Sequence, residues 1–184
     1  MAEIPSARDR LLAAARQLFW ARGYANVSVR ELAGAAEVDI ALISRYFGGK
    51  RGLFQATLTD AFADIELPAC GAEALVDHAV RLFVEAPRDG VTPSLLQMML
   101  MNAHDADVGA EVRALHGDRL QKRLERLIGA PDRAALFMAA LLGLSVAEKS
   151  LRLAGIARPG TAEYEAQLRH MMQAALSYRH DSRD

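Results

Sequence analysis

The sequence predicts an all-α protein in which a short N-terminal domain of three helices precedes a larger helical domain. Apolar residues recur at helical spacing along almost the whole of its 184 residues. Alternating β-branched runs, which are typical of strands, are absent apart from the brief Val27-Ser28-Val29. Glycines and prolines fall between the periodic segments, where helices are expected to end.

The first helix is predicted over residues 7–22. Leu11, Ala15 and Leu18 recur at helical spacing within it. Ser6 and Asp9 resemble a capping box at its start, with Asp in place of the usual Glu. Gly23 is expected to end the helix in a left-handed cap.

Three further helices follow closely. The second is expected to begin at Ser28, which forms a capping box with Glu31. The third is expected to begin after Asp39, a suitable N-cap, and to stop at Gly48-Gly49. The fourth is predicted from about residue 50 to residue 66.

The rest of the chain is predicted to form five more helices, over about residues 72–86, 93–104, 107–128, 132–154 and 161–178. The domain boundaries that we predict are therefore 1–49 and 50–184.

Composition is that of a soluble globular protein, with 52% hydrophobic and 24% charged residues. No apolar run reaches the roughly 18 residues that cross a membrane, and no signal peptide is evident. The single cysteine, Cys70, cannot form an internal disulfide. Because no segment can cross a membrane, we expect no membrane contact. Because no internal disulfide can form, we expect a cytoplasmic location.

Charge is distributed unevenly. Residues 1–51 contain eight basic and five acidic side chains, whereas the remainder contains 14 basic and 18 acidic ones. A basic N-terminal segment on an acidic remainder suggests that only the former meets a polyanion.

The second and third predicted helices have the spacing of a helix-turn-helix, in which the second helix enters a DNA major groove. Ala33 is small enough for the helix crossing. Val38, Ile43 and Phe47 are predicted to face inward, so Ile40, Ala41, Ser44 and Arg45 face outward. An exposed Ile40 can contact a thymine methyl, and Arg45 a guanine or a phosphate.

Lys50 stands in the first turn of the fourth helix, where its charge opposes the helix dipole. A docked phosphate would make this position favourable, because helix N-terminal amides and an ammonium together bind anions. The alternative for each of these basic residues is a merely solvated charge.

Residues 8–58 resemble the DNA-binding domain of the TetR/AcrR family of transcriptional regulators, through the runs "LLAAARQLFWARGYANVSVRELAGAAEV" and "RYFGGKRGLF" and through Lys50 heading a long helix. The resemblance implies a helix-turn-helix DNA-binding domain and a ligand-binding and dimerisation domain. It also implies a homodimeric repressor that leaves a palindromic operator when an unidentified small molecule binds. The positions that match the family's DNA contacts are Ser28, Arg30, Ile40, Ala41, Leu42, Ser44, Arg45, Tyr46 and Lys50.

One departure from the family lies in the turn, where Glu37 replaces the usual glycine. If the left-handed backbone is kept, this replacement costs about 1 kcal/mol. A second departure is the recognition helix itself, which carries Asp39, Ile40, Ala41 and Leu42 and so changes the operator that it reads.

Dimer contacts are expected on the last two helices. The segment 132–154 is apolar nearly all round, so a partner subunit is expected to cover one side of it and form a four-helix bundle. The alternative is that these residues form the core of a single chain. The residues expected at the interface are Leu136, Ala140, Gly143, Leu144, Ala147, Tyr164, Leu168, Met171, Met172 and Ala175.

Effector contacts are sought among polar and methionine side chains on otherwise apolar helices. Methionine lines adaptable pockets but also fills ordinary cores. The candidates are Phe62, Glu66, His78, Met98, Met101, Asn102, His104 and Ser145. No metal-ligand spacing, cofactor loop or catalytic motif is found.

Other functions remain open beside the repressor. An enzyme is disfavoured by the missing motifs. An activator, or a helical interaction protein without DNA binding, remains as an alternative. A redox role for Cys70 has no basic neighbour in the sequence to support it.

Overall fold

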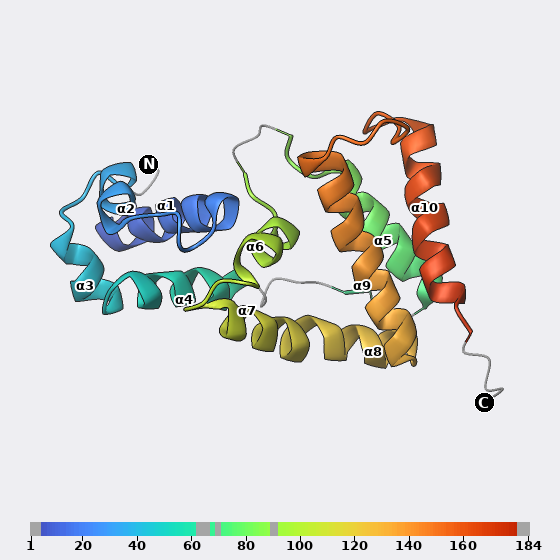
Figure 1. Cartoon of the computed structure of the whole chain (residues 1–184), viewed down its shortest axis with the longest axis horizontal. Helices are drawn as coiled ribbons and strands as arrows, with labels where there is room; N and C mark the ends of the chain where they lie inside the picture. Colours follow the sequence, from blue (N-terminus) through green and yellow to red (C-terminus); the bar gives the residue numbers. More distant parts are fainter. Residues whose placement is uncertain (1–4, 62–66, 69–70, 89–91, 180–184) are drawn as a thin grey trace. The chain divides into compact units, whose positions relative to one another are not determined.

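The computed structural model describes residues 5–61, 67–68, 71–88 and 92–179, and all regular structure in these residues is helical (Figure 1). Two segments, η1 and η2, are π-helical. The elements are α1 (Ala7–Arg22), α2 (Val29–Ala35), α3 (Ala41–Phe47), α4 (Lys50–Ala61), α5 (Ala72–Val84), α6 (Leu95–Asn102), α7 (Gly109–His116), η1 (Gly117–Gln121), α8 (Lys122–Ile128), α9 (Pro131–Ser145), η2 (Val146–Ser150) and α10 (Ala162–Ser177).

The helices form two compact units. Unit 1 comprises Met1–Ile65 and Pro87–Leu115, and unit 2 comprises Glu66–Ala86 and His116–Asp184. Helices α4 and α6 both pack against α1 and so belong to the same unit as the three N-terminal helices.

The core of unit 1 is built around α1. Leu11, Phe19 and Trp20 of α1 are buried, and Phe54 of α4 packs edge-on against Phe19 with 5.4 Å between ring centroids. The Trp20 indole Nε1 donates to the Thr57 hydroxyl at 3.2 Å, so the polar edge of this large buried ring is satisfied.

Both ends of α1 follow from the sequence. The capping box of Ser6 and Asp9 is present as predicted. The helix also ends at Gly23 as predicted, but the prediction of a left-handed cap is wrong, because Gly23 has φ 84° and ψ 153°. A side chain there would also be crowded, since a Cβ would lie 3.1 Å from the Met101 carbonyl oxygen.

Helix α6 is fastened to the end of α1 by the fully buried Asn102. Its Oδ1 accepts from the backbone N–H of Tyr24 at 2.7 Å. Its Nδ2 donates to the carbonyl oxygens of Phe19, at 3.1 Å, and Met98, at 2.9 Å. A buried amide with all of these partners fixes the two segments tightly.

In unit 2, α10 packs against both α5 and α9, and α8 packs against α9. Figure 1 shows α5, α9 and α10 side by side in this unit. The Tyr164 hydroxyl of α10 donates to the Glu148 carboxylate of η2 at 2.5 Å. This bond ties the end of the α9 segment to α10.

Two predicted helices differ from the observed ones. The predicted helix 107–128 is divided into α7, the π-helical η1 and α8. The predicted helix 132–154 was too long, because helical structure ends with η2 at Ser150 and Arg152 has a φ of 49°. Leu151 and Leu153, whose apolar character suggested a continuing helix, are exposed instead. Within the described residues, no helix has both the length and the apolar character needed to cross a membrane.

Candidate nucleic-acid interface

Helices α2 and α3 form the predicted helix-turn-helix, supported by α1. Leu32, Ala33 and Ala36 of the α2 segment are buried, and Ile43 anchors α3 with an exposed fraction of 2%. Val38 and Phe47 are half-buried on the same inner side. The small Ala33 thus lies in the core, as the sequence predicted.

The turn between α2 and α3 contains a backbone conformation that favours glycine. Glu37 has a φ of 53°, as expected from its replacement of the family's glycine. The Val38 N–H donates to the Ala33 carbonyl at 3.0 Å, and the Arg10 guanidinium reaches the Glu37 carbonyl at 3.5 Å. These contacts fix the turn that sets the direction of α3.

Asp39 organises the start of α3. Its Oδ1 accepts from the Ala41 N–H at 2.7 Å, while Ile40 occupies the N-cap position. The prediction of Asp39 as the N-cap is therefore wrong by one residue, although its carboxylate does accept a bond from the first turn of α3. It also leaves Ile40 at the outer edge of the helix.

The outward side of α2 and α3 carries most of the predicted DNA-contacting residues. Ile40 and Tyr46 are 44% and 40% exposed, which is unusual for such large side chains. Within the described part of the chain, Arg30 and Arg45 form no ion pair. Leu42 is half-buried, so its side chain has less surface free than its neighbours. The exposed residues are Ser28, Arg30, Ile40, Ala41, Ser44, Arg45 and Tyr46.

The start of α2 is held by a reciprocal set of bonds. The Ser28 hydroxyl accepts from the Glu31 N–H at 3.2 Å, and the Ser28 N–H donates to the Glu31 carboxylate at 2.8 Å. Arg22 pairs with the same carboxylate at 3.0 Å. The hydrogen bonds from Ser28, and then that from Arg22, lower the pKa of Glu31 to about 2. The carboxylate is therefore ionised at neutral pH and stabilises this end of α2.

The junction from α3 to α4 depends on glycine. Gly48 ends α3 with a φ of 72°, and Gly49 follows with a φ of 124°. Gly52, in the first turn of α4, approaches α3 so closely that a Cβ would lie 1.8 Å from the Phe47 carbonyl oxygen. Gly52 was not among the residues predicted from the sequence, although a glycine inside the first turn of a helix is a signal of close approach.

Lys50 lies at the start of α4 with its side chain half-buried. Its Nζ lies 4.1 Å from the centroid of the Tyr24 ring. Burial raises the pKa of the Tyr24 hydroxyl, and the negative charges of Asp107 and Asp105 raise it further. The hydroxyl therefore stays protonated at neutral pH. Tyr24, which is buried beneath Lys50, was also not among the residues predicted from the sequence.

The residues predicted to contact an effector are divided between the two units. In unit 1, Met98 and Asn102 are fully buried and hydrogen-bonded to each other, while Met101 and His104 are exposed. In unit 2, His78 is half-buried and Ser145 is buried. Phe62 and Glu66 lie outside the described residues, as does Cys70.

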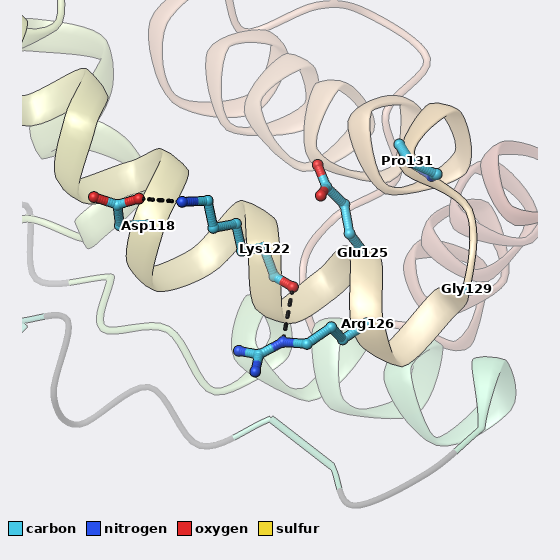
Figure 2. A pocket seen from close by; sticks show the side chains of 6 residues that line it. All are labelled: Asp118, Lys122, Glu125, Arg126, Gly129 and Pro131. Carbon is cyan, nitrogen blue, oxygen red and sulfur yellow. Dashed lines mark hydrogen bonds and ion pairs between the residues drawn. The ribbon is translucent and has the colours of Figure 1, made fainter.

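A pocket of about 550 Å³ lies in unit 2, at the connection from α8 to α9 (Figure 2). The residues that line it are Asp118, Lys122, Glu125, Arg126, Gly129 and Pro131, and none of the predicted effector contacts is among them. Three of its charged side chains are already engaged, since Lys122 pairs with Asp118 at 2.6 Å and Gln121 donates to Glu125 at 3.0 Å.

The residues predicted at a dimer interface fall into two groups. Leu144, Tyr164, Leu168 and Met172 are buried in the core of unit 2, because the apolar stripe of α10 faces α9 and α5. They stabilise the single chain. The remaining six are exposed or half-buried, namely Leu136, Ala140, Gly143, Ala147, Met171 and Ala175.

In the residues that the structure describes, no group of three or more His, Cys, Asp or Glu side chains is arranged to hold a metal ion.

Two family models match the chain. Residues 11–57, which include α2, α3 and most of α4, match the model described as "Bacterial regulatory proteins, tetR family". Residues 73–176 match "Tetracyclin repressor-like, C-terminal domain".

Curated relatives agree. The chain is 30% identical over 139 residues to the HTH-type transcriptional repressor Rv3405c of Mycobacterium tuberculosis (strain ATCC 25618 / H37Rv), covering 65% of this chain and 74% of that protein. It is 39% identical over 57 residues to the probable HTH-type transcriptional regulator YttP of Bacillus subtilis (strain 168), covering 31% and 28%.

Solved structures share the fold. AmtR of Mycobacterium smegmatis is similar with a TM-score of 0.57 at 21% identity, covering 96% of this chain and 89% of that one. A TetR-like transcriptional regulator from Rhodococcus sp. RHA1 is similar with a TM-score of 0.62 at 17% identity, covering 96% and 100%. The chain therefore belongs to the TetR family of helix-turn-helix transcriptional regulators, which are not enzymes.

Proposed function

We propose that this regulator is a homodimeric repressor that binds a palindromic operator and leaves it when a small molecule binds. The observation that carries the DNA-binding part is the outward side of α3. It holds Ile40, Ser44, Arg45 and Tyr46 in solvent, while Ile43 anchors the helix from behind. Within the described residues Arg45 forms no ion pair, and an exposed Ile40 and Arg45 on one side of α3 suit a major groove better than they suit water.

Affinity and sequence selectivity have different sources in this proposal. Ser28, Tyr46 and Lys50 lie where backbone phosphates would pass, so they supply salt-dependent affinity. Arg30, Ile40, Ala41, Ser44 and Arg45 face the base edges and supply selectivity. Leu42, half-buried, contributes an apolar contact at the edge of the groove. Operator binding places the action of the protein in the cytoplasm.

A palindromic operator has two half-sites, which a two-fold dimer of this chain would match. The exposed side of α9 carries Leu136 and Gly143, and half-buried small or flexible residues flank it on both α9 and α10. Small residues permit close helix crossing, so a four-helix bundle between two copies is the expected contact. Two α3 helices then meet half-sites about one turn of DNA apart, roughly 34 Å.

The effector part of the proposal is supported by the match of residues 73–176 to a tetracyclin repressor-like C-terminal domain. Among the members of the predicted set that the structure describes, Met101 and His104 are exposed and His78 is half-buried, so a ligand can reach these three. Asn102 and Met98 are engaged in the core of unit 1.

Fluorescence anisotropy tests the proposal directly. The full chain is titrated onto labelled duplex DNA from upstream of its own gene, with scrambled DNA of equal length as the control, at two salt concentrations. We expect tight, salt-sensitive and selective binding with two subunits per site. If binding to upstream DNA is weak, genomic DNA fragments that the protein retains are selected and tested in the same way. Binding to these fragments that is as weak as binding to scrambled DNA would overturn the repressor in favour of an interaction protein. A reporter gene that rises on deletion of the regulator separates a repressor from an activator.

Dimerisation has its own test in the variant Leu136→Glu, with Leu82→Glu as a matched control. Both leucines are exposed, but Leu82 lies on α5 rather than on the proposed interface. Light scattering should show a monomer for the first variant and a dimer for the second. A dimer in both would exclude this side of α9.

A further inference from the structure

The ammonium group of Lys50 lies against an aromatic ring rather than free in solvent. Its Nζ is 4.1 Å from the centroid of Tyr24, a favourable cation–π distance. No carboxylate in the described residues forms an ion pair with it. A lysine ammonium has three N–H donors, so contact of one side with the ring leaves donors for an oxygen on the other side.

The ring itself cannot move easily. Tyr24 is 7% exposed, and its ring packs against Phe19 and Phe54, with centroid distances of 5.5 Å and 5.4 Å. Its backbone N–H is bonded to Asn102, which is fully buried on α6. The ring is therefore held both by packing and by a buried hydrogen bond.

From this arrangement we infer that Tyr24 is a positioning residue for Lys50, holding its ammonium at the start of α4 for a DNA phosphate, with Asn102 fixing Tyr24 in turn. The inference rests on the proposed DNA binding. A lysine on a flexible four-carbon stem loses rotamer freedom when it contacts a phosphate, and a preorganised one loses less. Asn102 then acts from outside the helix-turn-helix, and its role is support of the DNA contact rather than effector binding.

In a competing possibility, the Tyr24 ring lowers DNA affinity instead of raising it. If the ring holds the ammonium away from DNA, Lys50 must leave Tyr24 before it can contact a phosphate. Removing the ring would then strengthen binding. The two possibilities are separable because they predict opposite changes in affinity.

A double-mutant cycle tests the inference with Tyr24→Leu, Lys50→Ala and the double variant. Tyr24→Phe is the conservative variant, because it keeps the ring. Affinity for operator and for random duplex DNA is measured over a range of salt. We expect Tyr24→Leu to weaken both by about threefold to tenfold. We also expect Lys50→Ala to lower the salt slope by roughly one unit. The double variant should bind no worse than Lys50→Ala alone, and Tyr24→Phe should bind like the wild type.

Phe54→Leu serves as the structural control. Phe54 belongs to the same aromatic cluster but is not the ring under Lys50. Any loss of DNA affinity caused by Phe54→Leu should therefore add to the loss caused by Lys50→Ala. The positioning role would be overturned if the affinity loss of Tyr24→Leu also added to that of Lys50→Ala, or if Tyr24→Leu bound DNA more tightly than the wild type.

The wild-type protein offers a readout that does not depend on a variant folding. Because the Lys50 ammonium lies over the Tyr24 ring, we expect the ring to shift the ε-methylene protons of Lys50 upfield in NMR spectra. We expect this shift to persist in the operator complex, and its loss there would overturn the inference. If Lys50→Ala leaves affinity and salt slope unchanged, the phosphate contact of Lys50 fails and the positioning role with it. If Lys50→Ala weakens DNA binding but Tyr24→Leu leaves the affinity unchanged, the positioning role alone fails.

Discussion

Asn102 accepts the backbone N–H of Tyr24 through its Oδ1 at 2.7 Å, although the two residues are 78 positions apart. The same side chain donates to the carbonyl oxygen of Phe19 at the end of α1. One buried amide therefore joins α6 to the helix that supports the helix-turn-helix. Losing it leaves the buried Tyr24 N–H without an acceptor, whereas the Phe19 carbonyl oxygen still accepts from the Gly23 N–H at 2.9 Å.

We expect Asn102→Leu to destabilise the protein by about 2 kcal/mol, because it removes the partners of buried polar groups without filling a cavity. Urea denaturation of the full chain measures the effect. Asn26→Ala is the matched control, since Asn26 is exposed and donates to the Arg22 carbonyl at the same end of α1. Its effect should stay within about 0.5 kcal/mol. Equal effects would show that burial of Asn102 does not matter.

Gly52→Ala should displace α3 and weaken operator binding strongly. The new methyl group would lie 1.8 Å from the Phe47 carbonyl oxygen, which is backbone and cannot rotate away. Overpacking of this kind costs about 2 kcal/mol. Gly34→Ala is the control, because a Cβ at Gly34 has no neighbour within 4 Å. That variant should be as stable as the wild type or slightly more so. Unchanged operator binding by Gly52→Ala would contradict the geometry of this junction.

Glu37→Gly should stabilise the protein by up to about 1 kcal/mol, because glycine adopts a φ of 53° without the clash that Glu37 carries. The Arg10 contact goes to the backbone carbonyl and is kept. Glu37→Ala separates the backbone effect from the charge, since alanine keeps the strain. In thermal unfolding, Glu37→Gly should have a higher melting temperature than both the wild type and Glu37→Ala. A gain with alanine of the same size would point to the charge instead.

Glu31 gives the stability of α2 a pH dependence. Its pKa falls from 4.5 to about 2 in the folded chain, so its stabilising effect is present above about pH 4.5 and is lost as the pH falls towards 2. The stability difference between wild type and Glu31→Gln should therefore shrink over that range. Urea midpoints at several pH values measure it. Glu85→Gln, which removes an equal charge at the exposed C-cap residue of α5, is the matched control. A constant difference for Glu31→Gln would exclude the assigned pKa.

Arg45→Ala should narrow the affinity gap between operator and random DNA by about tenfold, as expected when a bidentate base contact is lost. Competition anisotropy with both DNAs measures the gap. Arg16→Ala removes an equal charge from α1, where Arg16 lies over the Trp20 ring at 4.4 Å, and should leave the gap unchanged. If both variants behave alike, Arg45 contacts only phosphate.

Local features of the fold were predictable because they depend on neighbours in sequence. The capping boxes at Ser6 and Ser28 each join residues three positions apart. The left-handed backbone at Glu37 was predictable for a different reason, since it follows from the family resemblance. Most of the outward side of α3 followed from helical periodicity alone.

Long-range features were not predictable in the same way. Periodicity shows that α6 has a buried side, but not that its Asn102 faces the end of α1. Nor does it show that Lys50 meets Tyr24, which lies on a different element. Tyr164 illustrates the same limit, because an apolar stripe at helical spacing fits a partner subunit and a chain's own core equally well. Only the packing of α10 against α5 and α9 decides between them.

The close approach of Gly52 to Phe47 limits how this regulator can be re-engineered. A recognition helix transplanted from a relative would have to pack against α4 at this close approach, where even a methyl group does not fit. The smallest exchangeable cassette is therefore not α3 by itself but the stretch from the turn at Glu37 to Gly52. Libraries that vary operator preference should randomise the outward positions of α3 and keep both ends of this cassette intact.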